Sequence, residues 1–375
     1  MNRILLVLQL ATLGLVAYVA LRPPPGQAEA AAAAAAAAGR GQSLEAAGAF
    51  AAAALAYEQA AALDPTQAGP RFDAARRAEA LGAIAAAELP GREVWARLDA
   101  VASALEAGGV AESVAVGRIL RLVLARAAGL RAEALAQLAK LVEAGEKSPW
   151  FAWHAGSLRL EEARLAEARE LLEGLVKAQP GFGAGWHRLA MTYVADGRHE
   201  AAIEALQRAV ASGAGVGAEV DLGRLFLKRE MWAEGLPHLE NALRARLSAP
   251  EMAEVLRLVA AAHFHLKRFE RAAETYQKAW DLVPDPRTLL SAAIALSAGE
   301  RPAEAMRLLA TLAPRAEEVP EVLYQQAAVA RALGQDARPV LERYLALARG
   351  REGEAERVKQ AEAALQAPAQ AAPLK

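Results

Sequence analysis

A small residue returns about every 34 positions in this chain of 375 residues, with apolar residues at fixed distances around it. A large apolar residue follows four positions later, an alanine or leucine follows seven positions later, and another small residue precedes it by twelve. A period of this length is typical of stacked repeats, so one supersecondary unit is predicted to recur along the chain. The recurring small residues are Ala53, Ala168, Ala202, Gly235, Ala272 and Ala305.

The segment around Ala202 indicates that the unit is helical. Ala202, Ala205, Leu206 and Ala209 fall at i, i+3, i+4 and i+7, which is one face of an α-helix. Small residues let two helices approach closely, and a large side chain from the neighbouring helix fills the gap. One such helix pair cannot cover its own apolar face, so an all-α fold of stacked pairs is expected.

The period and the pattern resemble the tetratricopeptide repeat (TPR), a helix–turn–helix unit. The clearest copy spans residues 183–215, where Gly197 is expected at the turn between the two helices. The resemblance implies a right-handed α-solenoid of tandem TPR-like hairpins. In this copy the matching residues are Trp186, Leu189, Ala190 and Tyr193 on the first helix, and Ala202, Leu206 and Ala209 on the second.

The solenoid is predicted to cover residues 34–353, and its copies differ in quality. Good copies cover residues 34–66 and 148–319, whereas a weaker copy at 320–352 has Pro339 where a small residue belongs. Residues 67–147 have lost the spacing and are interpreted as degenerate repeats. The pattern in this stretch still predicts paired helices, with breaks at Pro90-Gly91 and Gly108-Gly109.

An apolar run of 18 residues, from Ile4 to Leu21, lies near the N-terminus between Arg3 and Arg22. Its length fits a membrane-spanning helix, which needs about 17–25 residues. A cleaved secretory signal, with an apolar core of about 7–15 residues, is the alternative. The expected order is a cytoplasmic stub at residues 1–3, a transmembrane helix or signal segment at 4–21, and a linker at 22–33.

The same segment predicts where the repeats lie. The N-terminal amine and Arg3 outweigh Arg22, so the N-terminus is expected to stay in the cytoplasm. Abundant alanine, arginine and glycine suggest a bacterial source. The prediction is a single-pass protein of the bacterial inner membrane with periplasmic repeats. Secretion to the periplasm after signal cleavage is the alternative.

Both ends of the repeat array have helical signals. Residues 30–38 are all alanine, which favours a helix on propensity, although a compliant spacer is the other interpretation. Residues 354–375 are expected to form a polar capping helix, as the exposed face of a last repeat requires, followed by a disordered tail.

The composition excludes several kinds of chemistry. The chain has no cysteine, which removes disulfides, thiolate metal sites and a cysteine nucleophile. A net charge of −1 gives no global attraction to nucleic acid, and no nucleic-acid partner is predicted. No catalytic motif, cofactor site or metal site is recognised, so the protein is predicted not to be an enzyme. His263 and His265 point about 200° apart on a helix and cannot share a metal ion.

In the TPR family the first helix of each pair lines the concave surface, so the resemblance implies a protein-binding groove there. Arg224, Lys228 and Arg257 make the charged part of this groove cationic, which favours a partner segment with acidic and apolar side chains. Alternatively, Trp150 and Trp153 pack between repeats and the arginines lie over alanines. The candidate groove residues are Trp150, Trp153, His187, Met191, Val220, Arg224, Lys228, Arg257, Phe264 and His265.

The predicted function is therefore that of a non-enzymatic scaffold or adaptor for protein–protein interaction. The membrane segment from Ile4 to Leu21 would tether it to the bacterial inner membrane, and the groove would bind a protein partner within an envelope assembly. A soluble exported periplasmic chaperone and a recruitment subunit of an envelope enzyme are the alternatives.

Overall fold

The computed structural model describes residues 26–85 and 91–366, and all regular structure in these residues is helical. The predicted all-α fold is therefore confirmed. The predicted transmembrane or signal segment at residues 4–21 lies outside the described residues, as does the expected tail at 367–375. Among helices α2–α20, which all lie in the described part of the chain, none has the combination of length and apolar character that a bilayer crossing requires.

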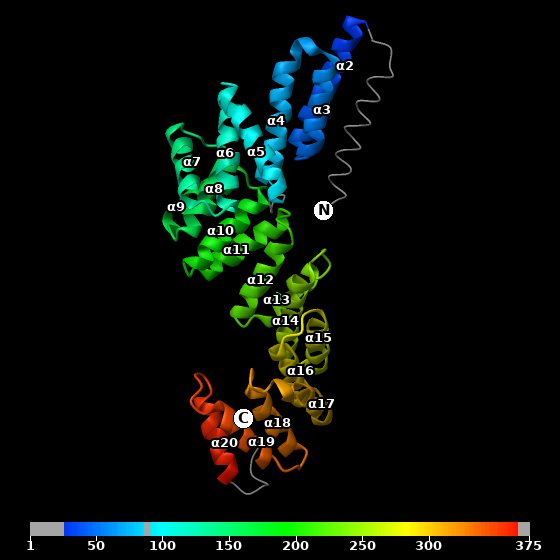
Figure 1. Ribbon diagram of the computed structural model, residues 1–375, viewed down its shortest axis with the longest axis vertical. Coiled ribbons are helices and arrows are strands. Elements are labelled where there is room, and N and C mark those ends of the chain that lie inside the picture. The colour runs from blue at the N-terminus through cyan, green and yellow to red at the C-terminus, as the bar shows by residue number, and fades with distance from the viewer. Residues whose placement is uncertain (1–25, 86–90, 367–375) are drawn as a thin grey trace. The chain divides into compact units, whose positions relative to one another are not determined.

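The chain divides into two compact units, Met1–Gln179 and Pro180–Lys375. In unit 1 most consecutive helices pack against each other (Figure 1). A 3-10 turn at Pro65–Gln67 precedes α4. The helices of unit 1 are α2 (Gln27–Ala46), α3 (Phe50–Leu63), α4 (Ala68–Ala85), α5 (Arg92–Ala107), α6 (Ala111–Ala127), α7 (Arg131–Glu143), α8 (Pro149–Glu161) and α9 (Leu165–Ala178).

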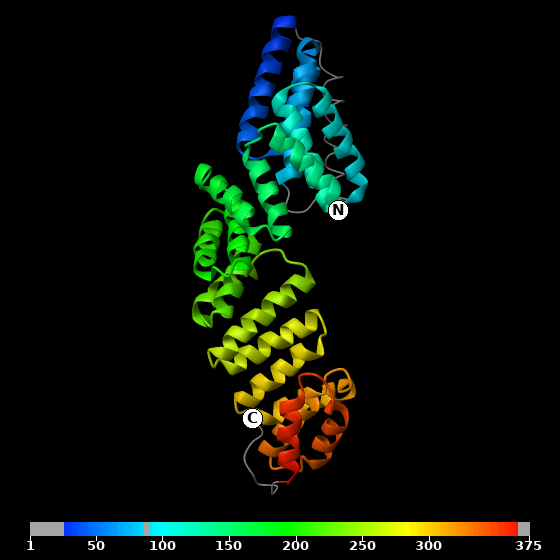
Figure 2. The same ribbon diagram turned by 90° about the vertical axis from the view of Figure 1, so that its left-hand side faces the viewer.

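Unit 2 is the more regular part of the array. Its helices around residues 249–298 lie side by side and antiparallel (Figure 2). A 3-10 turn at Ala313–Arg315 follows α17. The helices of unit 2 are α10 (Gly183–Ala195), α11 (His199–Ala211), α12 (Val216–Lys228), α13 (Trp232–Ala242), α14 (Ala249–His265), α15 (Phe269–Leu282), α16 (Pro286–Ala298), α17 (Pro302–Leu312), α18 (Glu321–Ala332), α19 (Arg338–Ala348) and α20 (Ala355–Gln366).

The recurring small residues hold the two helices of each pair together, as predicted. A Cβ atom placed on Gly156 of α8 would lie 2.7 Å from Cγ of Leu172, which comes from α9 and is fully buried. Gly223 has the same relation to Leu239, at 2.6 Å. In both of these pairs a leucine of the second helix fills the space that a side chain would take at the glycine of the first helix. The recurring small residues therefore mark the positions where the two helices of a pair are in close contact.

A left-handed residue recurs at described turns inside the hairpins, five positions before the small residue of the second helix. Gly197, predicted at such a turn, has φ of 73°. Gly129 has φ of 74° and stands five positions before the fully buried Ala134 of α7. Helices α6 and α7 are thus a TPR-like hairpin inside the stretch interpreted as degenerate. The sequence concealed it because Leu122 occupies the first-helix position where other copies have a small residue.

The linker expected at residues 22–33 is partly wrong. Helix α2 begins at Gln27, so residues 27–33 belong to its first two turns. Alanine has the lowest cost of any residue in a helix, and the run at residues 30–38 continues the helix rather than interrupting it. The first repeat is consequently longer than predicted.

Pro339 is compatible with the second helix of the weak copy because of its position in that helix. It stands in the first turn of α19, where a missing backbone N–H leaves no intrahelical hydrogen bond unmade. Leu341, Tyr344 and Leu345 bury the inner face of this helix instead. The predicted capping helix is α20, whose Ala361 is fully buried.

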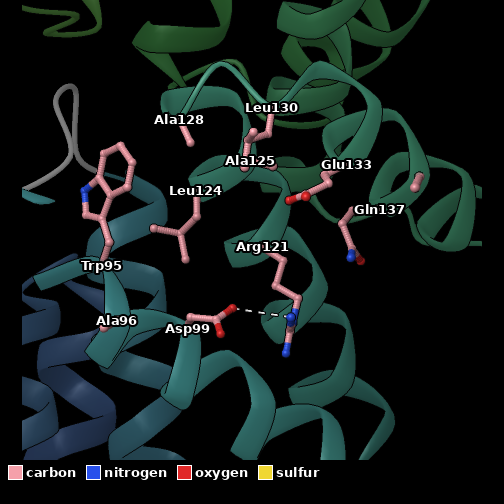
Figure 3. Close-up of a pocket in the computed structure, with 11 residues that line it drawn as sticks. Trp95, Ala96, Asp99, Arg121, Leu124, Ala125, Ala128, Leu130, Glu133 and Gln137 are labelled. Atoms are coloured by element: carbon pink, nitrogen blue, oxygen red, sulfur yellow. Dashed lines mark ion pairs between the residues drawn. The ribbon is translucent and has the colours of Figure 1, made fainter.

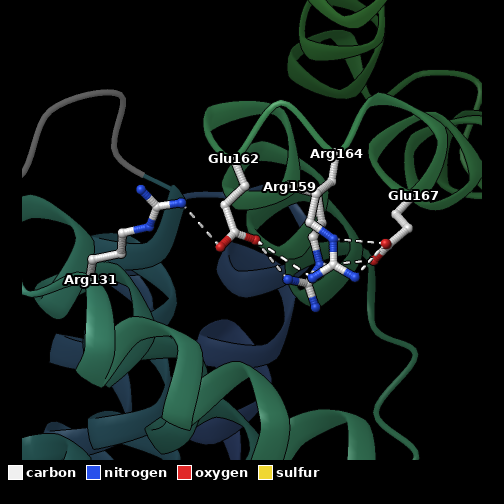
Figure 4. A network of polar contacts seen from close by, with 5 residues as sticks. All are labelled: Arg131, Arg159, Glu162, Arg164 and Glu167. Carbon is white, nitrogen blue, oxygen red and sulfur yellow. Dashed lines mark hydrogen bonds and ion pairs between the residues drawn. The ribbon is translucent and has the colours of Figure 1, made fainter.

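A charged network holds the turn between α8 and α9 (Figure 4). Glu162 lies 2.7 Å from Arg159, 3.3 Å from Arg131 of α7 and 4.0 Å from Arg164. Its side chain is only 10% exposed, and hydrogen bonds from Arg159 and Arg131 lower its carboxyl pKa. The next residue, Ala163, has φ of 58°, so the network fixes a turn that lacks the usual glycine.

Candidate functional site

Eight of the ten candidate groove residues given by the resemblance lie in unit 2, on α10, α12 and α14. These are the first helices of three consecutive hairpins. Repetition at about 34 residues brings equivalent positions of successive first helices next to each other, so residues one repeat apart can pair. We call this surface the first-helix face: His187 and Met191 of α10, Val220, Arg224 and Lys228 of α12, and Arg257 of α14.

A chain of polar contacts crosses the first-helix face. Nε2 of His187 lies 2.8 Å from Oδ2 of Asp221, a residue on the next first helix. Oδ1 of Asp221 lies 3.4 Å from Nη1 of Arg224. Arg224 in turn reaches Glu254 of α14 at 3.9 Å, and Nε of Arg257 donates to the same carboxylate at 3.2 Å. Acids and bases thus alternate across three helices.

These contacts change the expected charge of the groove. Two of its three predicted cations, Arg224 and Arg257, are paired with Asp221 and Glu254, so the face is mixed in charge rather than cationic. The sequence reasoning missed both acids because it considered only the groove positions of the family. The available signal was spacing, because each acid stands three residues before an arginine on the same helix.

Lys228 is different from the two arginines. It is exposed at the last position of α12, and its side chain makes no ion pair within the described part of the chain. Met191 is half-buried and packs against the core beneath α10. The first-helix face therefore has one cation, Lys228, without an ion-pair partner among the described residues. It also has a row of paired charges from His187 to Arg257, here called the ladder, with apolar surface beside it.

Phe264 and His265, the last two candidates on α14, take part in aromatic contacts. Phe264 meets Phe269 of α15 edge to face, with ring centroids 5.4 Å apart. His265 stacks on Trp232 of α13 at 3.8 Å and an interplanar angle of 2°. One face of the imidazole is thus covered by tryptophan, so His265 serves packing at the helix end as well as any partner.

Trp150 and Trp153 lie in unit 1, on α8. Their rings meet edge to face at 6.1 Å, and Trp150 also meets Phe50 of α3 at 6.3 Å. Trp150 borders a cavity of about 440 Å³ that Tyr57 and Arg77 also line. Burial and a hydrogen bond to a glutamate raise the pKa of Tyr57 to about 12. The contact with Phe50 agrees with the alternative in which these tryptophans pack between repeats.

The two histidines of α14 point in different directions, as their spacing of two residues on a helix predicts. His263 is buried, whereas His265 is exposed. Burial lowers the pKa of His263 and favours the neutral ring. Across residues 26–85 and 91–366, no group of three or more histidine, aspartate or glutamate side chains is arranged to hold a metal ion.

The comparison with protein families identifies the repeats. Residues 159–221 and residues 220–285 each match a model of the tetratricopeptide repeat. The matches include α9 through α15 and thus the first-helix face. The chain therefore contains tetratricopeptide repeats, which typically mediate protein–protein interaction. A search of the curated proteins found no match.

Three solved structures resemble parts of this chain in the arrangement of their helices. The C-terminal part of a TPR repeat-containing protein from Cytophaga hutchinsonii is 18% identical, and the match covers 64% of this chain and 98% of that one with a TM-score of 0.53. The pilF protein of Pseudomonas aeruginosa is 20% identical, with 56% and 96% covered and a TM-score of 0.44. YrrB, described as a TPR protein with an unusual peptide-binding site, is 15% identical, with 46% and 88% covered and a TM-score of 0.42. The first of these structures, with its TM-score of 0.53, supports the assignment of the fold.

Proposed function

We propose that this protein is a non-enzymatic adaptor that binds a segment of a partner protein on the first-helix face of unit 2. The observation that carries the proposal is the conjunction of an uncommitted cation, Lys228, with the half-buried apolar Met191 and Val220 on adjacent first helices. Tetratricopeptide repeats over residues 159–285 support a role in protein–protein interaction.

The partner segment is proposed to carry acidic and apolar side chains. A carboxylate placed at Lys228 meets a cation that no neighbour neutralises. A carboxylate placed at Arg224 competes with Asp221 and Glu254, which already hold that guanidinium. Specific recognition is therefore expected to centre on Lys228, while the ladder fixes the relative positions of α10, α12 and α14.

The proposal includes a membrane tether. Its support is the apolar run from Ile4 to Leu21, whose length is sufficient to cross a bilayer. A tether would hold the repeats near the membrane and raise their effective concentration toward partners in an envelope assembly. Fractionation tests this part: the full chain is expected in the membrane fraction at full size. A shortened chain in the soluble periplasmic fraction would support the exported chaperone instead.

Site-specific photo-crosslinking in the native cell tests the binding face. A photoreactive amino acid at position 191 is expected to give a defined adduct with a partner protein. The same amino acid in place of Glu204, which is exposed on the second helix α11, is expected to give none. Identical adducts from both positions would show that the first-helix face is not the binding surface.

A pair of charge reversals tests the role of Lys228. Lys228→Glu is expected to reduce the adduct from position 191 by about fivefold or more, because a partner carboxylate would then face a like charge. Lys278→Glu on α15 changes the same net charge at an exposed position of a second helix and is expected to leave the adduct unchanged. Equal loss in both variants would contradict the proposal.

A further inference from the structure

A second cavity lies in unit 1, away from the residues that the TPR resemblance selects. Its volume is about 570 Å³, and it opens between α5, α6 and α7 (Figure 3). Residues from all three helices point toward it. The lining consists of Trp95, Ala96 and Asp99 of α5, Arg121, Leu124 and Ala125 of α6, Ala128 and Leu130 of the turn, and Glu133, Ala136 and Gln137 of α7.

One part of this cavity is apolar. Trp95 forms one side and Leu124 the floor, as Figure 3 shows. Leu130 stands at the rim just before α7, and 48% of its surface is exposed. A bound group that covers Trp95 and Leu130 removes apolar surface from water, which favours binding. The cavity thus suits a ligand with an aliphatic or aromatic part.

The single cation of the lining, Arg121, already has two acidic neighbours. Its Nη1 lies 3.3 Å from Asp99, its Nε lies 2.8 Å from Glu106, and its Nη2 donates to Oγ of Ser103 at 2.7 Å. No nitrogen of this guanidinium is left without a neighbouring acceptor. The cavity therefore does not recruit an acidic ligand through Arg121.

The opposite wall carries one carboxylate, that of Glu133, which no described cation neutralises. Oε1 of Gln137 is buried and has no hydrogen-bond partner in the described residues. Glu133 lies four positions earlier on the same face of α7, and its exposed carboxylate forms no ion pair with any described residue. Oε1 of Gln137 has almost no accessible surface, so the carboxylate of Glu133 is the acceptor that a ligand in the cavity meets.

We propose that this cavity binds a basic side chain, arginine or lysine, that projects from a partner protein. The aliphatic stem lies against Trp95 and Leu124, and the cationic head donates hydrogen bonds to the carboxylate of Glu133. The lining carries two carboxylates, those of Asp99 and Glu133, against the one guanidinium of Arg121, so charge complementarity selects this occupant over an acidic or purely apolar one. The site lies among α5, α6 and α7 of unit 1 and is independent of the function proposed for unit 2. The protein therefore has two binding surfaces, as an adaptor requires.

Fluorescence anisotropy on the purified full chain tests the proposal with three dye-labelled peptides. They share one glycine–serine host with a flanking leucine and differ at the central residue, which is arginine, lysine or leucine. The arginine and lysine peptides are expected to bind at least fivefold more tightly than the leucine peptide at low ionic strength. Equal affinity for all three, or no binding of the arginine peptide at millimolar concentration, overturns the proposal.

Two matched variants locate the site. Glu133→Gln and Glu143→Gln each remove one exposed carboxylate from α7, and only the first borders the cavity. Glu133→Gln is expected to weaken the arginine peptide by about fivefold, which corresponds to about 1 kcal/mol, and Glu143→Gln to leave it unchanged. The same loss in both variants would mean that the peptide is held by the general field of the surface, and would overturn the site.

Discussion

Replacing Gly235 by alanine is expected to destabilise unit 2, although five of the six aligned repeats have alanine at this position. A Cβ atom on Gly235 would lie 2.9 Å from the backbone oxygen of Gly223 and 2.5 Å from Cδ1 of Leu227. Ordinary contact begins at 3.4 Å, so α12 and α13 must separate by about half an ångström. Glycine at both 223 and 235 leaves the backbones of α12 and α13 in close contact.

The magnitude follows from two opposing effects. Alanine is favoured over glycine inside a helix by about 1 kcal/mol. Overpacking a well-packed contact costs about 1–3 kcal/mol. The Gly235→Ala variant is therefore expected to lose up to about 2 kcal/mol of unfolding free energy. Gly174→Ala on α9 is the matched control, because a Cβ there meets nothing within 4 Å. It is expected to gain about 0.5–1 kcal/mol.

Native-state hydrogen exchange measures both effects where they arise, because repeat arrays open locally rather than as one unit. Amides of α12 and α13 are expected to exchange faster in Gly235→Ala, by up to about thirtyfold for a loss of 2 kcal/mol. Amides of α9 are expected to exchange more slowly in Gly174→Ala. If both substitutions protected their helices equally, the close approach of α12 and α13 would not be the reason for glycine at 235.

Three further perturbations test packing and charge. Ala202→Trp is expected to lower the unfolding free energy by about 1–3 kcal/mol, because Ala202 is fully buried, and a melting curve equal to wild type would contradict this. Glu162→Gln is expected to cost about 1 kcal/mol at neutral pH in urea titration. Because the folded pKa of Glu162 is lowered, wild type should lose this contribution as the pH falls below 4.5, and the variant should show no such loss. His263 has a lowered folded pKa, so its neutral form stabilises the protein and stability should fall as the pH drops below 6.5; His263→Leu should flatten this dependence, and an unchanged slope would contradict it.

The candidate site was predictable in part. Family spacing placed most candidate residues on α10, α12 and α14, which are the first helices of consecutive hairpins, and it selected Lys228 as a cation. It did not predict that Asp221 and Glu254 would hold Arg224 and Arg257. Those partners depend on which way each side chain leaves its helix. The alternative for Trp150, contact between repeats, agrees with its position against Phe50.

The sequence by itself determined the hairpins, since helix periodicity and the size of the residue at each helix contact are local properties that survive in the order of the amino acids. The turn at Gly197 and the contact of Gly156 with Leu172 follow from spacing alone. Only the tertiary structure decided how the less regular helices α5, α6 and α7 meet, and so where Trp95, Glu133 and Gln137 converge. Side chains on separate helices come together according to crossing angles and backbone separations, and these are set by the packing of every layer at once.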